Sequence, residues 1–350
     1  AFKRDLTDYK TIADFAAMVQ SPERLKLLLV LTVADIRAVG PGVWNGWKGQ
    51  LLRELYSATE AVFRGGRGSD AAAALRRYQE NAAYDARVRL AKADAGAEPW
   101  GDAMEDAYFT AFTDDEVLTH ARLALAASSG PGSAAEGRVR RDLNASEVVV
   151  AAADRPRLFV DLAEAITGAG ANVVGARVFT SRGGQALDVF YVQDVTGAPF
   201  GANDDRALDR LAKALASAAR GEPVIRERRR QDLGRAAAFA ITPAVMLDNE
   251  ASEMSTVVEA SGRDRPGLLA GLARTLSDAG LLITSAHIDG YGERAVDCFY
   301  VVDAEGQKVT DARKGNALKA ALLATLSDSD ADSTGGRRGN LQRARASVAR

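Results

Sequence analysis

The chain has 350 residues, of which 47% are hydrophobic, and its formal net charge is −2. This charge gives no global basic field that would attract nucleic acid or an anionic membrane. No apolar run approaches the roughly 20 residues of a membrane-spanning helix, and no signal peptide is visible. The single cysteine, Cys298, fits a reducing cytoplasm. The two histidines, His120 and His287, lie far apart, so they cannot form a histidine-rich metal site.

The first third of the chain, up to about residue 127, is predicted to be helical. Leu25, Leu28 and Leu29 recur at helical spacing. Ser21-Pro22 before them is typical of a helix start. Because the helical pattern is already under way at the first residues, we expect the chain to belong to a longer protein.

The pattern changes from about residue 128 onward. The stretch "SSGPGSAAEG" (128–137) predicts a linker. After it, the run "SEVVVAAA" is followed by an amphipathic helix, by two strands joined through the turn "SRGG", and by a second helix. A fourth strand is expected in "PVIRER" or in "AVMLDN".

This arrangement occurs twice. Asp154-Arg155-Pro156 opens a helix in the first copy, and Asp264-Arg265-Pro266 opens its counterpart in the second. The strand "DVFYV" (188–192) returns as "DCFYV" (297–301). The distance along the sequence between these two strands is one residue shorter than the distance between the two Asp-Arg-Pro motifs. The missing residue falls in the hairpin turn, where a deletion is tolerated. Repeated βαββαβ units are typical of the ferredoxin-like fold. We therefore expect a multidomain chain with an all-α first third and two α+β units.

The repeated motif has the chemistry of a small-molecule site. The free amides and the dipole of a helix start favour a carboxylate nearby, and an aspartate can cap such a start. Gly267, in the second copy, would let a ligand approach the backbone closely. We interpret the motif as a pocket for a small zwitterion whose ammonium group binds Asp264. A plain helix start is the alternative.

The segments "DRPGLL" and "DxFYV" resemble those of ACT domains, the small modules that sense amino acids. Two such modules behind "TVADIRAVGPGVWNGWKGQLLRELY" resemble the C-terminal part of the bifunctional uridylyltransferase/uridylyl-removing enzymes, which act on the PII nitrogen-signalling protein. This resemblance, together with the polar composition of the linker and the tail, implies six segments: the end of an HD phosphohydrolase domain (1–64), a helical connector and linker (65–143), a first ACT domain (144–228), an inter-repeat segment (229–253), a second ACT domain (254–328) and a disordered tail (329–350).

The resemblance also implies the chemistry of the parent enzyme. A nucleotidyltransferase domain would use UTP and Mg²⁺, or another divalent metal, to uridylylate PII, and the HD domain would remove the modification. Glutamine bound to the ACT region would favour removal. Both catalytic centres would lie before Ala1, so we expect no complete catalytic site in this chain. Asp35, in "LTVADIRA", matches the position of a metal-ligating aspartate of the HD domain, with a helix aspartate that has a surface partner as the alternative.

The second repeat is the expected sensor. Its expected L-glutamine ligands are Asp264, Arg265, Pro266, Gly267, Leu268, Ser285 and His287. The first repeat keeps Asp154 and Pro156 but has Arg157 in place of the glycine, which indicates a degenerate site. We also expect the two repeats to pair edge to edge into a longer sheet, because pairing protects their edge strands.

Two other interpretations stay open at this stage. The chain could be the ACT-bearing regulatory half of another HD enzyme, such as an alarmone hydrolase, although "GPGVWNGWKGQLLRELY" favours the uridylyltransferase family. The ACT pair could also serve assembly alone, without a ligand. The stretch "GGRGSD" (65–70) superficially resembles a nucleotidyltransferase loop, but it lacks the paired carboxylates that metal-assisted transfer needs. We interpret it as a linker.

Overall fold

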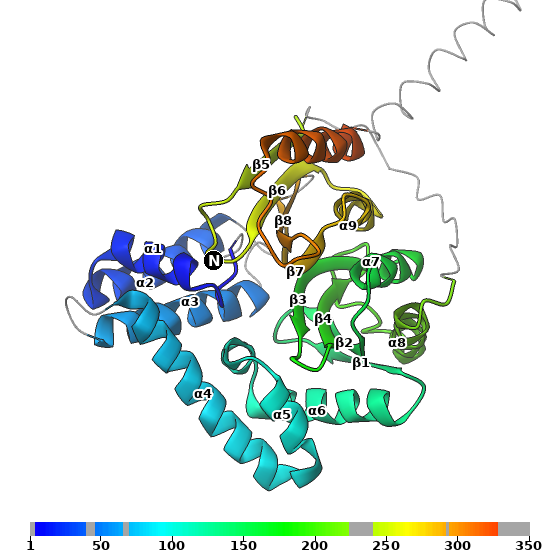
Figure 1. Cartoon of the computed structure of the whole chain (residues 1–350), viewed down its shortest axis with the longest axis horizontal. Coiled ribbons are helices and arrows are strands. Elements are labelled where there is room, and N and C mark those ends of the chain that lie inside the picture. Colours follow the sequence, from blue (N-terminus) through cyan, green and yellow to red (C-terminus); the bar gives the residue numbers. More distant parts are fainter. Residues whose placement is uncertain (1–3, 40–45, 66–69, 224–240, 292–293, 328–350) are drawn as a thin grey trace, which may run out of the picture.

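The computed structural model describes residues 4–39, 46–65, 70–223, 241–291 and 294–327. Its first part, which we call the helical region (residues 4–129), is all-α as expected (Figure 1). None of the described helices is long and apolar enough to cross a lipid bilayer. The helices of this region are α1 (Tyr9–Val19), α2 (Pro22–Val39), α3 (Gly46–Arg64), α4 (Ala71–Ala93), α5 (Glu98–Ala103) and α6 (Asp114–Ser129), with short 3₁₀ turns at Ala95–Ala97 and Asp106–Thr110.

Two four-stranded antiparallel sheets follow, each with helices on one face. The first unit contains β1 (Ser133–Arg140), β2 (Ala145–Ala153), α7 (Leu158–Gly168), β3 (Asn172–Thr180), β4 (Gln185–Gln193) and α8 (Asp205–Ala219). The second contains β5 (Ala244–Asp248), β6 (Thr256–Arg263), α9 (Leu268–Asp278), β7 (Leu282–Tyr291), β8 (Arg294–Val302) and a last helix over residues 312–327. The strand orders β1-β2-β4-β3 and β5-β6-β8-β7 are the same, which confirms the predicted pair of ferredoxin-like units.

The fourth strand of each sheet differs from the prediction. It comes before the Asp-Arg-Pro motif rather than after it: β1 pairs with β2, and β5 pairs with β6. The prediction of a linker at 128–137 is therefore wrong, because β1 begins at Ser133. "AVMLDN" is likewise not the fourth strand of the first unit but the edge of the second sheet. "PVIRER" lies almost wholly outside the described residues, as do "GGRGSD" for the most part and the tail.

The two units lie side by side in a pseudo-twofold arrangement. Their outer strands β3 and β7 are neighbours, and α7 packs against α9 (Figure 1). An ion pair joins Glu164 of α7 to Arg274 of α9, and these residues occupy equivalent positions in the two repeats. The outer strands are thus close neighbours, but they do not form the expected longer sheet: β3 and β7 belong to separate sheets, and no backbone hydrogen bond links the parts of them that the structure describes.

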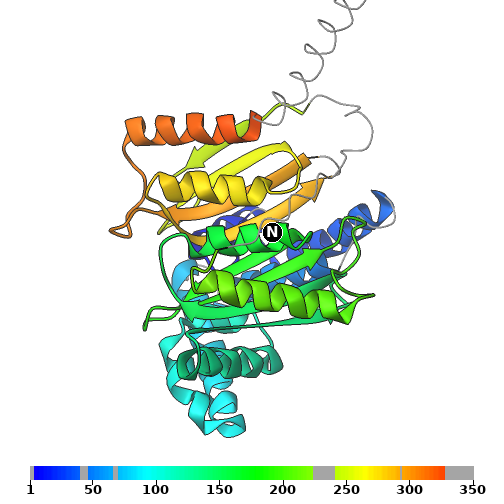
Figure 2. The same ribbon diagram turned by 90° about the vertical axis from the view of Figure 1, so that its right-hand side faces the viewer.

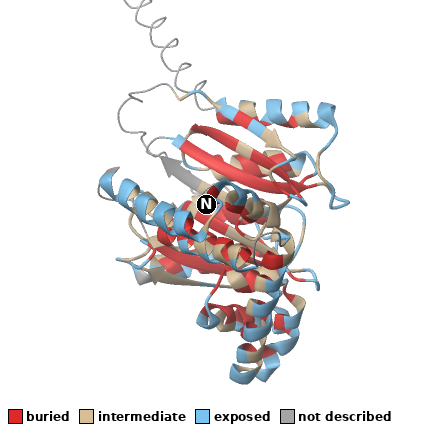
Figure 3. Cartoon of the chain, turned by 90° about the vertical axis from the view of Figure 1, so that its left-hand side faces the viewer, coloured by how far each residue is buried: buried red, intermediate tan, exposed pale blue. Residues whose placement is uncertain are grey.

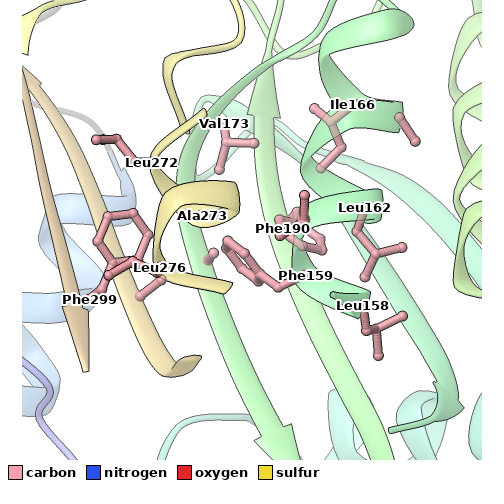
Figure 4. Packing of buried hydrophobic residues seen from close by; sticks show 14 of the residues in the cluster. Leu158, Phe159, Leu162, Ile166, Val173, Phe190, Leu272, Ala273, Leu276 and Phe299 are labelled. Carbon is pink, nitrogen blue, oxygen red and sulfur yellow. The ribbon is translucent and has the colours of Figure 1, made fainter. Parts of the chain in front are cut away.

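One hydrophobic core continues beneath the helices of both units. Figure 4 shows α7 and α9 facing each other across it, with Phe159 and Phe190 from the first unit and Leu272 and Phe299 from the second. The opposite face of the first sheet packs on the helical region, which forms a further layer (Figure 2). The opposite face of the second sheet has only a small core of its own, made by Val257, Cys298 and Tyr300. That face is consequently where polar contacts can form.

Candidate functional site

The Asp-Arg-Pro-Gly turn of the second repeat leads from β6 into α9. Gly267 has a left-handed backbone conformation (φ 79°, ψ 3°), which glycine adopts without steric cost. The helix starts at Leu268, so Pro266 lies in the turn before the helix and not in its first position. No side chain caps the start of α9. The first amides of this helix are consequently left without a side-chain partner from the turn.

Three residues of this turn are held by the protein itself. Burial raises the pKa of Asp264, and a hydrogen bond from the Arg265 amide opposes this rise. Arg265 donates from Nη2 to the Thr325 carbonyl oxygen, 2.6 Å away, and so fixes the turn to the last helix. Leu268 is buried in the common core. Arg265 and Leu268 therefore have structural partners, and their expected role as ligands stays a prediction.

The first repeat forms the same turn with an arginine in place of the glycine. Arg157 adopts φ 68° and ψ 5°, the conformation of Gly267, and again no side chain caps the helix that follows. The guanidinium of Arg157 donates from Nη1 to Oδ1 of Asp278 at the end of α9, 2.8 Å away. Asp154 and Pro156 are exposed, and Asp154 accepts a hydrogen bond from the Thr180 hydroxyl at 3.3 Å.

The two ends of the α7–α9 contact are thus equivalent by the repeat but differ in chemistry. At one end, Arg157 and Asp278 form an ion pair across the repeats. At the other end, glycines occupy the equivalent positions of the aligned repeats: Gly267 is equivalent to Arg157, and Gly168 to Asp278. A Cβ atom added to Gly267 would lie 3.6 Å from Cγ2 of Thr167, which places this glycine against the end of α7. The glycine end offers a helix start without a side-chain cap and the half-buried carboxyl of Asp264, and Gly168 there replaces the aspartate that pairs with Arg157 at the other end.

Ser285 and His287 lie elsewhere. Ala286 between them faces the core under the helices, so their side chains face the opposite side of the second sheet. There they line a cleft of about 560 Å³ between the helical region and the strands β3 and β7, and Asp264–Leu268 do not line it. Burial lowers the pKa of His287 to about 4, although Asp5 opposes this change. The structure therefore does not bring the two groups of expected glutamine ligands into one site.

The cleft contains residues that the sequence analysis did not single out. Arg177 of β3 occupies in the first repeat the position that His287 occupies in the second. Its guanidinium binds Glu54 of α3 at 2.8 and 2.9 Å, and its side chain is only 10% exposed. Asp5, from the segment before α1, approaches both Arg177 and His287. Arg177 could have been found from the sequence by aligning the two repeats, because it then falls opposite His287.

Asp35, the expected metal ligand, is exposed on α2. The same helix is exposed over most of its length (Figure 3). It carries large apolar side chains at Leu27, Leu28, Val30 and Leu31, which are between 40% and 66% exposed. Among the described residues, no group of three or more His, Cys, Asp and Glu side chains could hold a metal ion. The residues present thus do not fit a divalent-metal centre by themselves, because Asp35 supplies a single carboxylate.

Comparison with known proteins shows which proteins this chain is similar to. A bifunctional uridylyltransferase/uridylyl-removing enzyme of Phenylobacterium zucineum is 80% identical to the chain over 351 aligned residues, which are 100% of this chain and 37% of the relative. The corresponding enzyme of Caulobacter vibrioides is 65% identical over 100% of this chain and 37% of the relative. That of Azospirillum brasilense is 42% identical over 95% of this chain and 36% of the relative. The chain is homologous to the C-terminal region of bifunctional uridylyltransferases/uridylyl-removing enzymes.

The chain spans little more than a third of the length of these uridylyltransferase/uridylyl-removing relatives. Residues 251–326 match the model of the N-terminal ACT domain of the ACR family, which identifies the second repeat as an ACT domain. Among solved structures, aspartate kinase from Synechocystis is similar over 53% of this chain and 27% of the kinase chain, with 18% identity and a TM-score of 0.30.

Proposed function

We propose that this chain is the glutamine-sensing regulatory region of an enzyme that uridylylates the PII protein and removes that modification. The two activities in the name of the homologous enzymes support the first part of this proposal, and the ACT match supports amino-acid sensing. PII as the protein substrate and glutamine as the effector follow from the sequence resemblance. UTP and a divalent metal would be used by the part of the parent enzyme that precedes this chain.

The difference between the two ends of the α7–α9 contact carries the sensing proposal. At the Gly267 end, amides at the uncapped start of α9 can donate hydrogen bonds to the carboxylate of an amino acid, and the Asp264 carboxyl can accept a hydrogen bond from its ammonium group. At the Arg157 end, the equivalent space is crossed by the ion pair with Asp278. Glutamine is therefore expected to bind beside Gly267, between the two repeats, and to favour one relative arrangement of them.

Calorimetry of this chain with L-glutamine tests the site. We expect measurable heat from the native chain and none from Gly267→Arg, which places in the second turn the residue that the first turn already carries. Because Arg157 shows that an arginine can adopt this backbone conformation, the variant should fold, and circular dichroism checks that it does. Heat that persists in Gly267→Arg, or no heat from the native chain, would contradict the proposal.

We also propose that residues 1–64 complete an HD domain whose other part precedes this chain. The exposed apolar side chains around Asp35 support this, because a solvated helix rarely presents four neighbouring large apolar residues. This chain alone should then neither uridylylate PII with UTP and Mg²⁺ nor remove the modification. Turnover of either kind by the purified chain, measured with labelled UTP or uridylylated PII, would show that a catalytic centre has been overlooked.

A second candidate function is assembly without a ligand. The core that continues through both repeats and the Glu164–Arg274 pair favour it, because they hold the repeats together in the absence of any ligand. The same calorimetric titration separates the two functions, since a pure assembly module gives no heat with any of the common amino acids.

A further inference from the structure

The helical region contacts the first repeat at one side of the β3–β7 junction. The Trp47 ring of α3 lies on the Tyr191 ring of β4, with 4.1 Å between the ring centroids. About two turns further along α3, Glu54 binds Arg177 of β3 at 2.8 Å. Arg177 also lies over the Trp47 ring, 5.0 Å from its centroid. These contacts fix α3 to the first repeat.

The same region contacts the second repeat through residues 4–8, which we call the strap. The Asp5 amide donates to the Tyr300 hydroxyl oxygen of β8 at 2.8 Å. Burial opposes ionisation of the Asp5 carboxyl, but His287 and the Thr7 and Ser285 side chains together hold its pKa below the usual value. Asp8 accepts a hydrogen bond from the Ser252 hydroxyl. Of the two repeats, the second therefore holds the strap through these hydrogen bonds, while the first holds α3.

These two attachments use equivalent positions of the two repeats. His287 is the counterpart of Arg177, and Tyr300 is the counterpart of Tyr191 in the strands "DCFYV" and "DVFYV". The local register repeats as well, because Gly175 opposes Tyr191 and Ser285 opposes Tyr300, each next to a break in the ladder. The helical region therefore spans the junction and holds each repeat at the same place in its sheet.

The junction between the attachments can change its spacing more easily than either sheet can deform. No backbone hydrogen bond between β3 and β7 appears among the described residues, and the 560 Å³ cleft lies between them and the helical region. On the helix side, the repeats are joined by the common hydrophobic core, which sets no fixed register, and by the side-chain pairs Arg157–Asp278 and Glu164–Arg274. A shift of one repeat against the other must then move the strap relative to α3, or release one of them.

We propose that the helical region is coupled to the spacing of the two repeats through these two attachments, α3 on the first repeat and the strap on the second. In the complete enzyme this would transmit ligand occupancy at Gly267 to the domain that contains the strap, and this last step rests on the proposed glutamine site. This coupling does not depend on glutamine, because any change in the contact between the repeats should alter the hydrogen bonds of the strap.

Hydrogen exchange of this chain, measured by mass spectrometry on strap peptides, tests the attachment first. Tyr300→Phe removes the acceptor of the Asp5 amide, so strap exchange should be about fivefold faster. Tyr191→Phe is the matched control: its hydroxyl is buried without a hydrogen-bond partner among the described residues, and its ring still stacks on Trp47. The control should leave strap exchange unchanged. Unchanged exchange in Tyr300→Phe would overturn the proposal.

A second pair of variants tests the coupling between the repeat–repeat contact and the strap. Arg157→Ala combined with Arg274→Ala loosens the helix side of the junction and touches no strap residue, so faster strap exchange is the expected result. Arg210→Ala breaks the exposed pair with Asp204 within the first repeat and should have no effect. If the double variant leaves the strap as protected as in the native chain, the proposal fails. Calorimetry of the native chain measures glutamine binding separately. Failure of the glutamine site is therefore distinguishable from failure of the coupling to the strap.

Discussion

Arg157 of the first repeat donates a hydrogen bond from Nη1 to Oδ1 of Asp278 in the second, at 2.8 Å, and so ties the start of α7 to the end of α9. The arginine does this from a left-handed backbone conformation. Such a conformation is unfavourable for a residue with a side chain by about 1 kcal/mol. The ion pair is exposed on both sides, at 42% and 62%.

Replacement of Arg157 by glycine should therefore change the free energy of unfolding little. Relief of the backbone conformation offsets the loss of an exposed ion pair, which contributes about 0–1 kcal/mol. Asp278→Ala loses the pair without that relief and should be less stable than Arg157→Gly. Urea denaturation of the three proteins measures the difference. We also expect Arg157→Gly to gain a second glutamine-binding event, and its absence would mean that more than Arg157 closes the first site.

Gly175→Ala should loosen the contact between α3 and the first sheet. A Cβ atom at Gly175 would lie 2.9 Å from Cε2 of the Trp47 ring, closer than real side chains pack. We expect a loss of about 1–3 kcal/mol in the free energy of unfolding, as for other overpacked positions. Gly183→Ala is the control, because a Cβ there meets only the Ser181 hydroxyl at 3.8 Å. Equal stability of the two variants would mean that Trp47 can move aside freely.

Stability should depend on pH through Asp188. This side chain is buried, and its Oδ1 lacks a hydrogen-bond partner among the described residues. Burial, with a smaller effect of Asp154, raises its pKa from 3.8 to about 8. The folded chain therefore keeps the proton over a pH range in which the unfolded chain releases it. The free energy of unfolding should fall as pH rises from about 4 to about 8.

Asp188→Asn should flatten this dependence and stabilise the chain at pH 8 by about 1–3 kcal/mol. Urea denaturation between pH 5 and pH 8 is the measurement. Asp154→Asn serves as the control for the electrostatic part, because removal of that charge should shift the transition to lower pH. A native chain whose stability is constant over this range would contradict the assignment.

The exposed apolar side chains of α2 should make the isolated chain self-associate. Leu31 is 65% exposed, whereas Leu25 on the same helix is buried. Leu31→Glu should reduce the concentration dependence of the apparent mass in light scattering without loss of folding. Leu25→Glu should instead destabilise the helical region. If Leu31→Glu associates as strongly as the native chain, another surface drives association.

The fold could be predicted from the sequence wherever the two repeats resemble each other. The Asp-Arg-Pro turns, the helices after them and the "DxFYV" strands recur, and each forms the expected element. The edge strands β1 and β5 could not be found in this way. They occupy equivalent places, yet "SAAEGRVR" and "AVMLD" share no pattern. An edge strand has one hydrogen-bonded neighbour and one open side, so it tolerates more sequence change than a central strand.

The candidate site was predictable only in part. The exchange of Gly267 for Arg157 was visible in the repeat, and the structure shows what the exchange does, because Arg157 reaches Asp278. The expectation that Ser285 and His287 bind the same ligand as Asp264 is not met, because their side chains lie on the face of the sheet opposite to the helices. The contact of Asp5 with Tyr300 spans 295 residues of sequence and involves no repeated element. Only tertiary structure reveals such a contact.

The place of β1 and β5 determines how either repeat can be isolated. A shortened protein that begins at residue 144 or 254, where the motif similarity starts, would lack β1 or β5 and leave the long central strand β2 or β6 with bare amides and carbonyls. Bare strand edges recruit other chains, so such fragments should precipitate or form fibrils. An autonomous unit has to begin no later than Ser133 for the first repeat and Ala244 for the second.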